Sequence, residues 1–249
     1  MIKYCFLFIL PFLFSCIQVN NDGSLANKNK EDSIKKSILN KWNSEDEFYS
    51  IYHLRNLKVE ITNVRPLQSD TSIKLCIPAA FTQLDDGSID GLFIINGKIV
   101  DAKKVNHHLG GGFLIVNDKI SIIKTDDGKF LTASCVDSLA NLKASFFQQI
   151  QLVRDGENLG FHKDQKLFQR RAVAIYENGE IAMIESKSPI TLDEFADDLV
   201  KMQVQNAIYT DMGSYDEGWA RNPENGTIKV LGSNRSETRN QSNWLIFKY

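Results

Sequence analysis

Apolar and polar residues alternate along much of the chain between residues 47 and 124, a period of two that predicts β-strands. Two strand-like runs in this region are interrupted by Asn96-Gly97 and by Asn117-Asp118, dipeptides that favour tight turns. A third turn dipeptide, Asn178-Gly179, separates two further apolar runs. Each of these three patterns predicts a β-hairpin.

The apolar period changes to that of a helix near residue 191. Thr191 and Glu194 have the spacing of a capping box, in which each side chain binds a backbone N–H of the other residue. Apolar residues then recur on one helical face at Leu192, Phe195, Ala196, Leu199 and Val200. This pattern predicts a helix over 191–202 that leads into a buried strand, Val204–Tyr209. Weaker patterns predict short helices over 31–42 and 137–147.

Many short strands with few helices favour the α+β class. We expect one folded domain with a mostly antiparallel or mixed sheet, several β-hairpins and two or three packed helices. The chain has 249 residues, which is enough to bury one sizeable core.

The first sixteen residues resemble a secretory leader. A basic residue, Lys3, precedes the apolar run Tyr4–Phe14, which is too short to span a bilayer. The sequence Leu13-Phe14-Ser15-Cys16 resembles the lipobox of bacterial lipoproteins, which implies cleavage before Cys16 and a lipid on its sulfur. A plain secretory signal, cleaved nearby, is the alternative. We therefore predict a signal peptide over 1–15, a flexible tether over 16–35 and the folded domain over 36–249, anchored to a membrane of the cell envelope.

Composition excludes one class of partner. The formal net charge is -2, and no run of Lys and Arg is longer than two residues. A nucleic-acid-binding surface is therefore not expected. Metal-ligand spacings, nucleotide-binding loops and the Ser nucleophile motif of hydrolases are also absent from the sequence.

Polar residues gather after the strand Val204–Tyr209. Asp211 follows directly, and Gly213, Ser214 and Asp216 come next. Ligand sites favour such positions, because the backbone can turn tightly where a strand ends. An ordinary strand-to-loop turn would have the same pattern.

Two other stretches carry candidate binding groups. Arg170 and Arg171 open a predicted strand, so one of them is expected to point into the protein and to need an anionic partner or ligand. His107 and His108 precede a Gly-rich stretch that includes Gly111, and its backbone N–H groups could bind an anion. Solvated strand ends and a flexible surface loop are the respective alternatives.

The order of these pieces over residues 74–219 resembles the phosphodiester glycosidase family, the uncovering-enzyme type that removes a sugar from a sugar-phosphate diester. The family patterns are N-G-G-F, Q-S-G-P, R-x-A-x-G and N-A-x-x-x-D-G-G-x-S. The corresponding stretches here are Pro78-Ala79-Ala80-Phe81, Phe147-Gln148-Gln149-Ile150, Arg170-Arg171-Ala172-Val173-Ala174 and the ten residues from Asn206 to Tyr215.

The resemblance implies a hydrolase that acts on a sugar-phosphate phosphodiester. Asp211 would be the acid or base, or would hold a metal, and Arg170 would bind the phosphate, with Arg171 as the second candidate. Asp216 or Glu217 would supply a second carboxylate. A divalent cation is compatible with this chemistry, although the sequence offers no ligand set for one. The expected substrate-binding residues are Arg171, Gly213, Ser214, Tyr215, Asp216, His107, His108, Gly111 and Trp219, and either Trp219 or Tyr215 would stack on a sugar.

Other functions fit the same sequence. Met212 and Tyr215 differ from the family pattern, so a lipoprotein that binds a surface glycan or an anion without cleaving it is the second hypothesis. A third is a structural partner in an envelope complex, which would use Trp and Tyr side chains for protein contacts.

Overall fold

The predicted β-hairpins form the framework of the fold. The computed structural model describes residues 42–45, 47–100, 105–161, 163–212, 216–233, 236 and 238–249, which all belong to one compact unit. The predicted signal peptide, Cys16, the tether and nearly all of the helix expected over 31–42 lie outside the described residues. The leader, the anchor and the domain boundary at residue 36 therefore stay predictions.

The strands form three antiparallel sheets, and every strand pairing among the described residues is antiparallel. The seven-stranded sheet has the order β1 (Asn43–Glu45), β2 (Tyr49–His53), β13 (Ile181–Ser186), β12 (Arg171–Tyr176), β14 (Val204–Tyr209), β10 (Gln151–Arg154), β11 (Glu157–Asn158).

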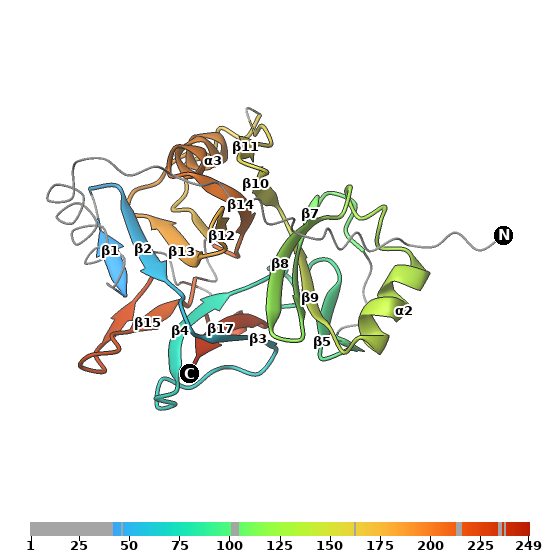
Figure 1. Ribbon diagram of the computed structural model, residues 1–249, viewed down its shortest axis with the longest axis horizontal. Helices are drawn as coiled ribbons and strands as arrows, with labels where there is room; N and C mark the ends of the chain where they lie inside the picture. Colours follow the sequence, from blue (N-terminus) through green and yellow to red (C-terminus); the bar gives the residue numbers. More distant parts are fainter. Residues whose placement is uncertain are drawn as a thin grey trace, which may run out of the picture. The chain divides into compact units, whose positions relative to one another are not determined.

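Two five-stranded sheets complete the framework (Figure 1). The β4 sheet has the order β16 (Ile228–Val230), β15 (Trp219–Arg221), β4 (Ile73–Pro78), β17 (Trp244–Lys248), β3 (Lys58–Thr62). The β9 sheet has the order β6 (Lys98–Ile99), β5 (Phe93–Ile95), β9 (Ser145–Gln149), β7 (Gly111–Val116), β8 (Lys119–Lys124).

Turn residues with positive φ close the predicted hairpins. Asn96 and Gly97 join β5 to β6 with φ of 48° and 79°, and Asn117 and Asp118 join β7 to β8 with φ of 50° and 61°. Two positive φ values in a two-residue loop are the signature of a type I′ turn. All three predicted hairpins are confirmed, including the one between β12 and β13.

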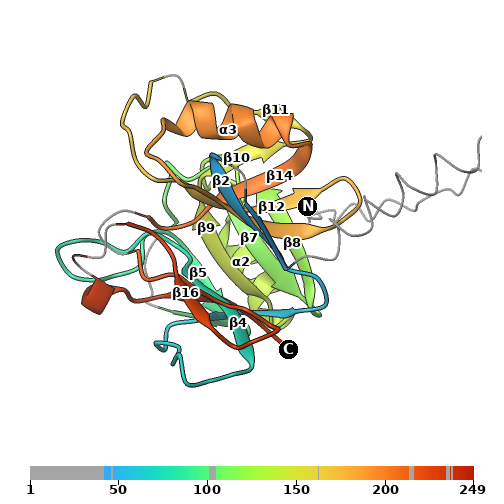
Figure 2. The same ribbon diagram turned by 90° about the vertical axis from the view of Figure 1, so that its left-hand side faces the viewer.

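Helix α3 (Leu192–Lys201) confirms the predicted amphipathic helix. Its capping box is formed, since Thr191 Oγ1 accepts from Glu194 N at 3.1 Å and Thr191 N donates to Glu194 Oε2 at 2.9 Å. Figure 2 shows α3 lying across the seven-stranded sheet. Its buried face packs on the small residues of that sheet, among them Ala172, Ala174 and Ala207.

The second helix begins earlier than expected. Helix α2 spans Ala133–Asn141, and Thr132 is its N-cap. The predicted bounds 137–147 are wrong at both ends, because Thr132 caps the helix four residues after Gly128 and the apolar residues Phe146 and Phe147 belong to the buried strand β9. Two α-helices and the 3₁₀ turn η1 (Thr238–Asn240) are the helical elements of the described residues, so helix content is small but consistent with the α+β class. Neither helix is long and apolar enough to cross a membrane.

The three sheets enclose a shared core. Residues from the inner faces of all three pack together, namely Val173, Met183 and Ile208 of the seven-stranded sheet, Leu75, Ile77, Leu245 and Phe247 of the β4 sheet, and Phe93, Phe113 and Phe147 of the β9 sheet. Along β12, Val173 faces this core while Ala172 and Ala174 face α3. Arg171, two positions before Val173, must therefore also point toward the inner side.

Candidate active site

Several strand ends meet where β14 leaves the seven-stranded sheet. Thr210 N donates to Arg171 O at 3.2 Å, which ties the end of β14 to the start of β12. Asp211 N donates to Ala79 O at 3.1 Å, directly after the end of β4. Asp211 thus lies at the junction of the seven-stranded sheet and the β4 sheet.

The Asp211 carboxyl is buried and weakly compensated. Its residue is 3% exposed, and Oδ2 accepts from Thr82 N at 3.0 Å. Burial raises the pKa of Asp211 to about 8, against the lowering effect of backbone hydrogen bonds from Thr82 and Met212. The charge of Asp216 raises this pKa further and that of Arg171 lowers it. Asp211 therefore carries its proton at neutral pH and can donate it.

Arg171 is the centre of a buried ion cluster. Arg171 Nε donates to Glu185 Oε2 at 2.6 Å, and Arg171 Nη2 lies 2.8 Å from Asp216 Oδ1. All three side chains are at most 7% exposed. Burial alone would lower the pKa of Arg171, but Asp216 and Glu185 raise it above its ordinary value. Arg171 Nη1 and Nη2 are buried and make no aligned hydrogen bond within the described residues, so the contact with Asp216 is an ion pair with imperfect alignment.

Two glycines make room for this cluster. A Cβ on Gly218 would lie 3.0 Å from Arg171 Nη2, and a Cβ on Gly232 would lie 1.2 Å from Asp216 Oδ2. Gly232 also has a positive φ of 74°, and its N–H donates to Glu185 Oε1 at 3.2 Å. Only glycine fits at position 232, because any side chain there would displace the Asp216 carboxylate.

The Arg170 guanidinium is bound by other groups of the protein. Its Nη2 donates to Lys166 O at 2.7 Å and its Nε to Ile190 O at 3.1 Å. Nη1 reaches Tyr209 Oη at 3.5 Å, and Asp164 lies 3.7 Å away. Since these partners occupy the guanidinium on several sides, Arg170 anchors the loop before β12, which does not fit its predicted role as the phosphate ligand.

Other predicted site residues have their recorded contacts with groups other than Asp211. The Trp219 ring packs within the β4 sheet and has the Arg221 guanidinium 5.6 Å from its centroid, so protein groups occupy the ring that was expected to stack on a sugar. Glu217 is paired with Arg65. His107 and His108 are exposed, and within the described residues no measured contact joins either of them to Asp211, Arg171 or Asp216.

The Gly-rich stretch after His108, expected either to bind an anion or to be a flexible surface loop, runs into a β-strand. Gly111 and Gly112 open the strand β7, and both are buried. A Cβ on Gly111 would meet Gln151 Cβ at 2.7 Å, so this glycine permits close packing between strands. Gly213, Ser214 and Tyr215 lie outside the described residues, and their predicted roles remain untested.

Three residues of the site were not predicted from the sequence: Thr82, Glu185 and Asn243. Glu185 could have been found, because it shares the inward-facing side of β13 with Met183 and a buried carboxylate needs a cation. Thr82 takes part through its backbone N–H, which carries no residue-specific signal. Asn243 is fully buried beside Ala80, 163 positions away in the sequence, and no local pattern indicates that contact.

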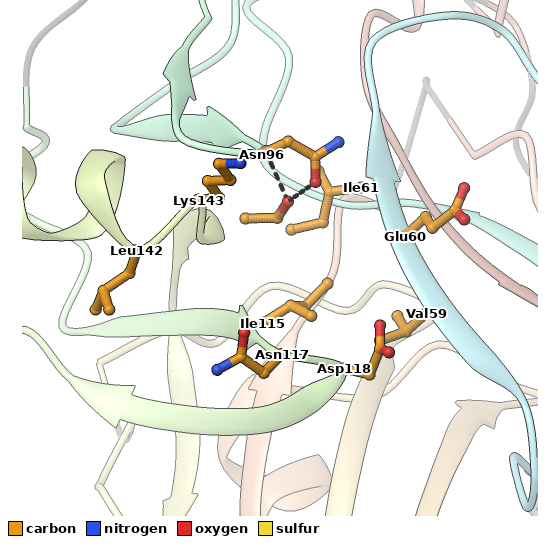
Figure 3. A pocket seen from close by; sticks show the side chains of 10 residues that line it. Val59, Glu60, Ile61, Asn96, Ile115, Asn117, Asp118, Leu142 and Lys143 are labelled. Atoms are coloured by element: carbon orange, nitrogen blue, oxygen red, sulfur yellow. Dashed lines mark hydrogen bonds between the residues drawn. The ribbon is translucent and has the colours of Figure 1, made fainter.

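A separate pocket of about 360 Å³ lies at the other end of the β9 sheet (Figure 3). Ser145, which opens β9, lines it, whereas Ile150 at the far end of β9 accepts a hydrogen bond from Tyr209 N. Figure 3 shows aliphatic Ile61 and Ile115 among polar rim residues such as Asn117. None of the predicted site residues lines this pocket.

The divalent cation stays an open prediction. The described residues contain no group of three or more His, Cys, Asp and Glu side chains that could hold a metal ion. The Asp216 carboxylate, a possible ligand by its chemistry, is already paired with Arg171.

The comparisons with known proteins agree with this architecture. The family model for phosphodiester glycosidase matches residues 71–247. The zebrafish N-acetylglucosamine-1-phosphodiester alpha-N-acetylglucosaminidase catalytic domain, auto-inhibited by its pro-peptide, matches with a TM-score of 0.57 and 17% identity over 83% of this chain and 81% of that one.

A hypothetical protein from Synechocystis shares the fold as well, with a TM-score of 0.53 and 11% identity over 83% of this chain and 61% of that one. No match is found among curated proteins. The matched region contains β4, the Arg171 cluster, Asp211 and all but the last residue of β17. The chain therefore belongs to the phosphodiester glycosidase family.

Proposed function

We propose that this chain is a secreted, lipid-anchored hydrolase that cleaves the glycosidic bond of a sugar-phosphate phosphodiester. The observation that carries the proposal is the Asp211 carboxyl, which is buried where the strands of two sheets end and whose pKa is raised by that burial to about 8. A glycosidase needs an acid of this kind, because the leaving oxygen must take up a proton as its bond to the sugar breaks.

In the proposed reaction, Asp211 gives its proton to the leaving phosphate oxygen while water adds to the anomeric carbon. The water loses a proton to a second carboxylate. Asp216 is favoured over Glu217 for this role, because its charge acts on the pKa of Asp211, whereas Glu217 is paired with Arg65. The products are the free sugar and a phosphomonoester, so atoms and charges balance.

Arg171 is the favoured ligand for the phosphate. Its Nη1 has no hydrogen-bond partner within the described residues, whereas Arg170 is occupied by backbone carbonyls. The two carboxylates beside Arg171 hold the guanidinium charged and in place. A charge-assisted hydrogen bond from Nη1 to a phosphate oxygen would then stabilise the leaving group.

The family and the zebrafish relative support the substrate class. That relative is by its description a phosphodiester glucosaminidase, so an N-acetylglucosamine-1-phosphodiester is a reasonable first probe. We expect the wild type to release the sugar from this probe, and Asp211→Asn to lose at least roughly 100-fold in turnover, the usual contribution of a general acid. Asp118→Asn, on the distant β7–β8 turn, is the matched control and should keep full activity.

A non-catalytic binder of glycans or anions is the second candidate. The observation in its favour is that both arginines are engaged by protein groups, which limits the positive charge available to a phosphate. Binding of the probe by the wild type without any turnover would support this candidate, whereas turnover that Asp211→Asn abolishes with binding retained would support the hydrolase.

Lipid anchoring can be tested separately from catalysis. Cys16→Ser removes the sulfur that the lipobox-like sequence would modify. We expect the wild type to partition into the membrane fraction and the Cys16→Ser protein to remain in the aqueous fraction when both are expressed in a bacterial host. Equal partitioning of both proteins would contradict the anchor.

A further inference from the structure

Asn243 has a hydrogen-bonding arrangement that the strand pattern alone does not require. The pairing of β4 with β17 ends at Pro78 and Trp244. Beyond this pair the Asn243 side chain continues the contact. Its Oδ1 accepts from Ala80 N at 2.7 Å and its Nδ2 donates to Ala80 O at 3.1 Å. The side-chain amide therefore binds both backbone groups of Ala80, as a neighbouring strand would.

The segment that Asn243 holds also contacts Asp211. Ala79 O accepts from Asp211 N, and Thr82 N donates to Asp211 Oδ2 at 3.0 Å. Asn243 Nδ2 further reaches Thr82 Oγ1 at 3.3 Å. The segment Ala79–Thr82 thus lies between Asn243 on one side and Asp211 on the other, and all four residues that make these contacts are at most 6% exposed.

Asn243 is itself held in place. Gln241 Nε2 donates to Asn243 O at 2.7 Å, and Ser242 Oγ lies 3.2 Å from Thr82 Oγ1. Since Asn243 is fully buried and its amide is paired at both ends, its orientation is determined by the protein and not by solvent.

We propose that Asn243 is a positioning residue that orients the Thr82 N–H toward the Asp211 carboxyl. Its role as a catalytic support rests on the proposed hydrolase function, but the positioning itself does not. Among the described residues, the titratable groups coupled to Asp211 are Arg171 of β12, Asp216 of the following loop and Tyr209 of β14, while the segment after β4 contributes neutral groups. Loss of the Thr82 hydrogen bond should therefore change the proton affinity of Asp211 without changing any nearby charge.

The first test follows the titration of Asp211 by ¹³C NMR of labelled aspartate, with Asp211→Asn to assign the signal. We expect Asn243→Ala to move the midpoint upward by about 0.5–1 pH unit, the value of one lost hydrogen bond to the ionised form.

A control variant separates the positioning effect from a general loss of rigidity. Asn158→Ala removes a side-chain amide that binds Asp197 on α3 at 2.8 Å and is not part of the hydrogen bonds around Ala80 and Thr82. It should not move the Asp211 midpoint. An unchanged midpoint in a folded Asn243→Ala protein, or an equal shift in the control variant, would overturn the proposal.

A measurement on the wild type covers the case in which Asn243→Ala does not fold. The Thr82 amide resonance should change with pH at the Asp211 midpoint, and this response should vanish in Asp211→Asn. A Thr82 amide that does not respond would overturn the proposal. Turnover of the wild type and of Asn243→Ala is assayed in parallel. If the wild type has no hydrolase activity but Asn243→Ala still shifts the midpoint, the proposed function is refuted and the positioning role stands. If the wild type is active, Asn243→Ala should lower kcat and leave KM nearly unchanged.

Discussion

Burial and hydrogen bonding act in opposite directions on the Asp211 carboxyl. Desolvation raises its pKa, and the Thr82 and Met212 amides lower it, with burial the larger effect. The raised pKa lets Asp211 act as an acid near neutral pH, and the burial that raises it lowers the free energy of unfolding whenever the carboxyl is ionised in the unfolded chain. The cost is tolerable because the carboxyl is neutral over most of the physiological range.

The pH dependence of stability follows from this pKa. Below about pH 4 the carboxyl is protonated in both the folded and unfolded chain and has no effect. Between pH 4 and the folded pKa of about 8, only the unfolded chain loses the proton, so the free energy of unfolding falls as pH rises. We expect the wild type to lose roughly 2 kcal/mol or more relative to Asp211→Asn between pH 4.5 and 8. Urea unfolding of both proteins across this range measures it, and parallel curves would contradict the burial argument.

A second residue-scale prediction concerns Gly232. Gly232 and Gly226 share a φ of +74°, but a Cβ on Gly226 meets nothing within 4 Å, whereas one on Gly232 would overlap Asp216. Gly226→Ala should therefore lower the free energy of unfolding by about 1–2 kcal/mol through backbone strain alone. Gly232→Ala should lower it by about 3 kcal/mol or more, because it also separates Asp216 from Arg171. Equal losses in urea titrations would show that the ion cluster does not depend on this glycine.

Among the secondary-structure elements, the pattern of the sequence was most informative where local chemistry decides the structure. Asn96-Gly97 and Asn117-Asp118 favour the left-handed backbone that a two-residue turn needs, and both hairpins formed as predicted. The hairpin at Asn178-Gly179 formed with a loop one residue longer, so that Arg171 pairs with Glu185 and not with Ser186. Because one step of register moves every side chain to the other face, the ion pair could not be derived from the turn dipeptide.

The start of α3 offers a test of element-level stability. Thr191→Ala removes the hydroxyl that accepts from Glu194 N, and it should lower the free energy of unfolding by about 1 kcal/mol. Thr132→Ala at α2 removes a longer contact, 3.3 Å to Cys135 N, without a capping box, and its effect should be smaller. Chemical denaturation compares the two variants. A larger loss at α2 would contradict the assigned importance of the capping box.

At the scale of the whole molecule, the site depends on contacts that no local pattern encodes. Asp211 and Arg171 were identified from the strand they end or open, since ligand sites favour the ends of strands. Thr82 and Asn243 come from the ends of β4 and β17, which meet Asp211 only after two sheets have packed together. The fold class was therefore accessible from periodicity, whereas the partners of the key carboxyl were not. For Arg170 the local pattern was misleading. Its place beside a strand end favoured a role as phosphate ligand, but its guanidinium donates to the backbone carbonyls of Ile190 and Lys166.

The most direct test of the central claim is the pH dependence of kcat/KM for hydrolysis of an N-acetylglucosamine-1-phosphodiester. If Asp211 is the acid, kcat/KM of the wild type should fall tenfold per pH unit above about pH 8, and Asp211→Asn should lose at least roughly 100-fold at pH 7 and lack this descending limb. Asp118→Asn should follow the wild type. A wild-type profile that stays flat from pH 6 to about pH 9.5, or an Asp211→Asn protein that keeps its activity, would contradict the assignment of Asp211 as the proton donor.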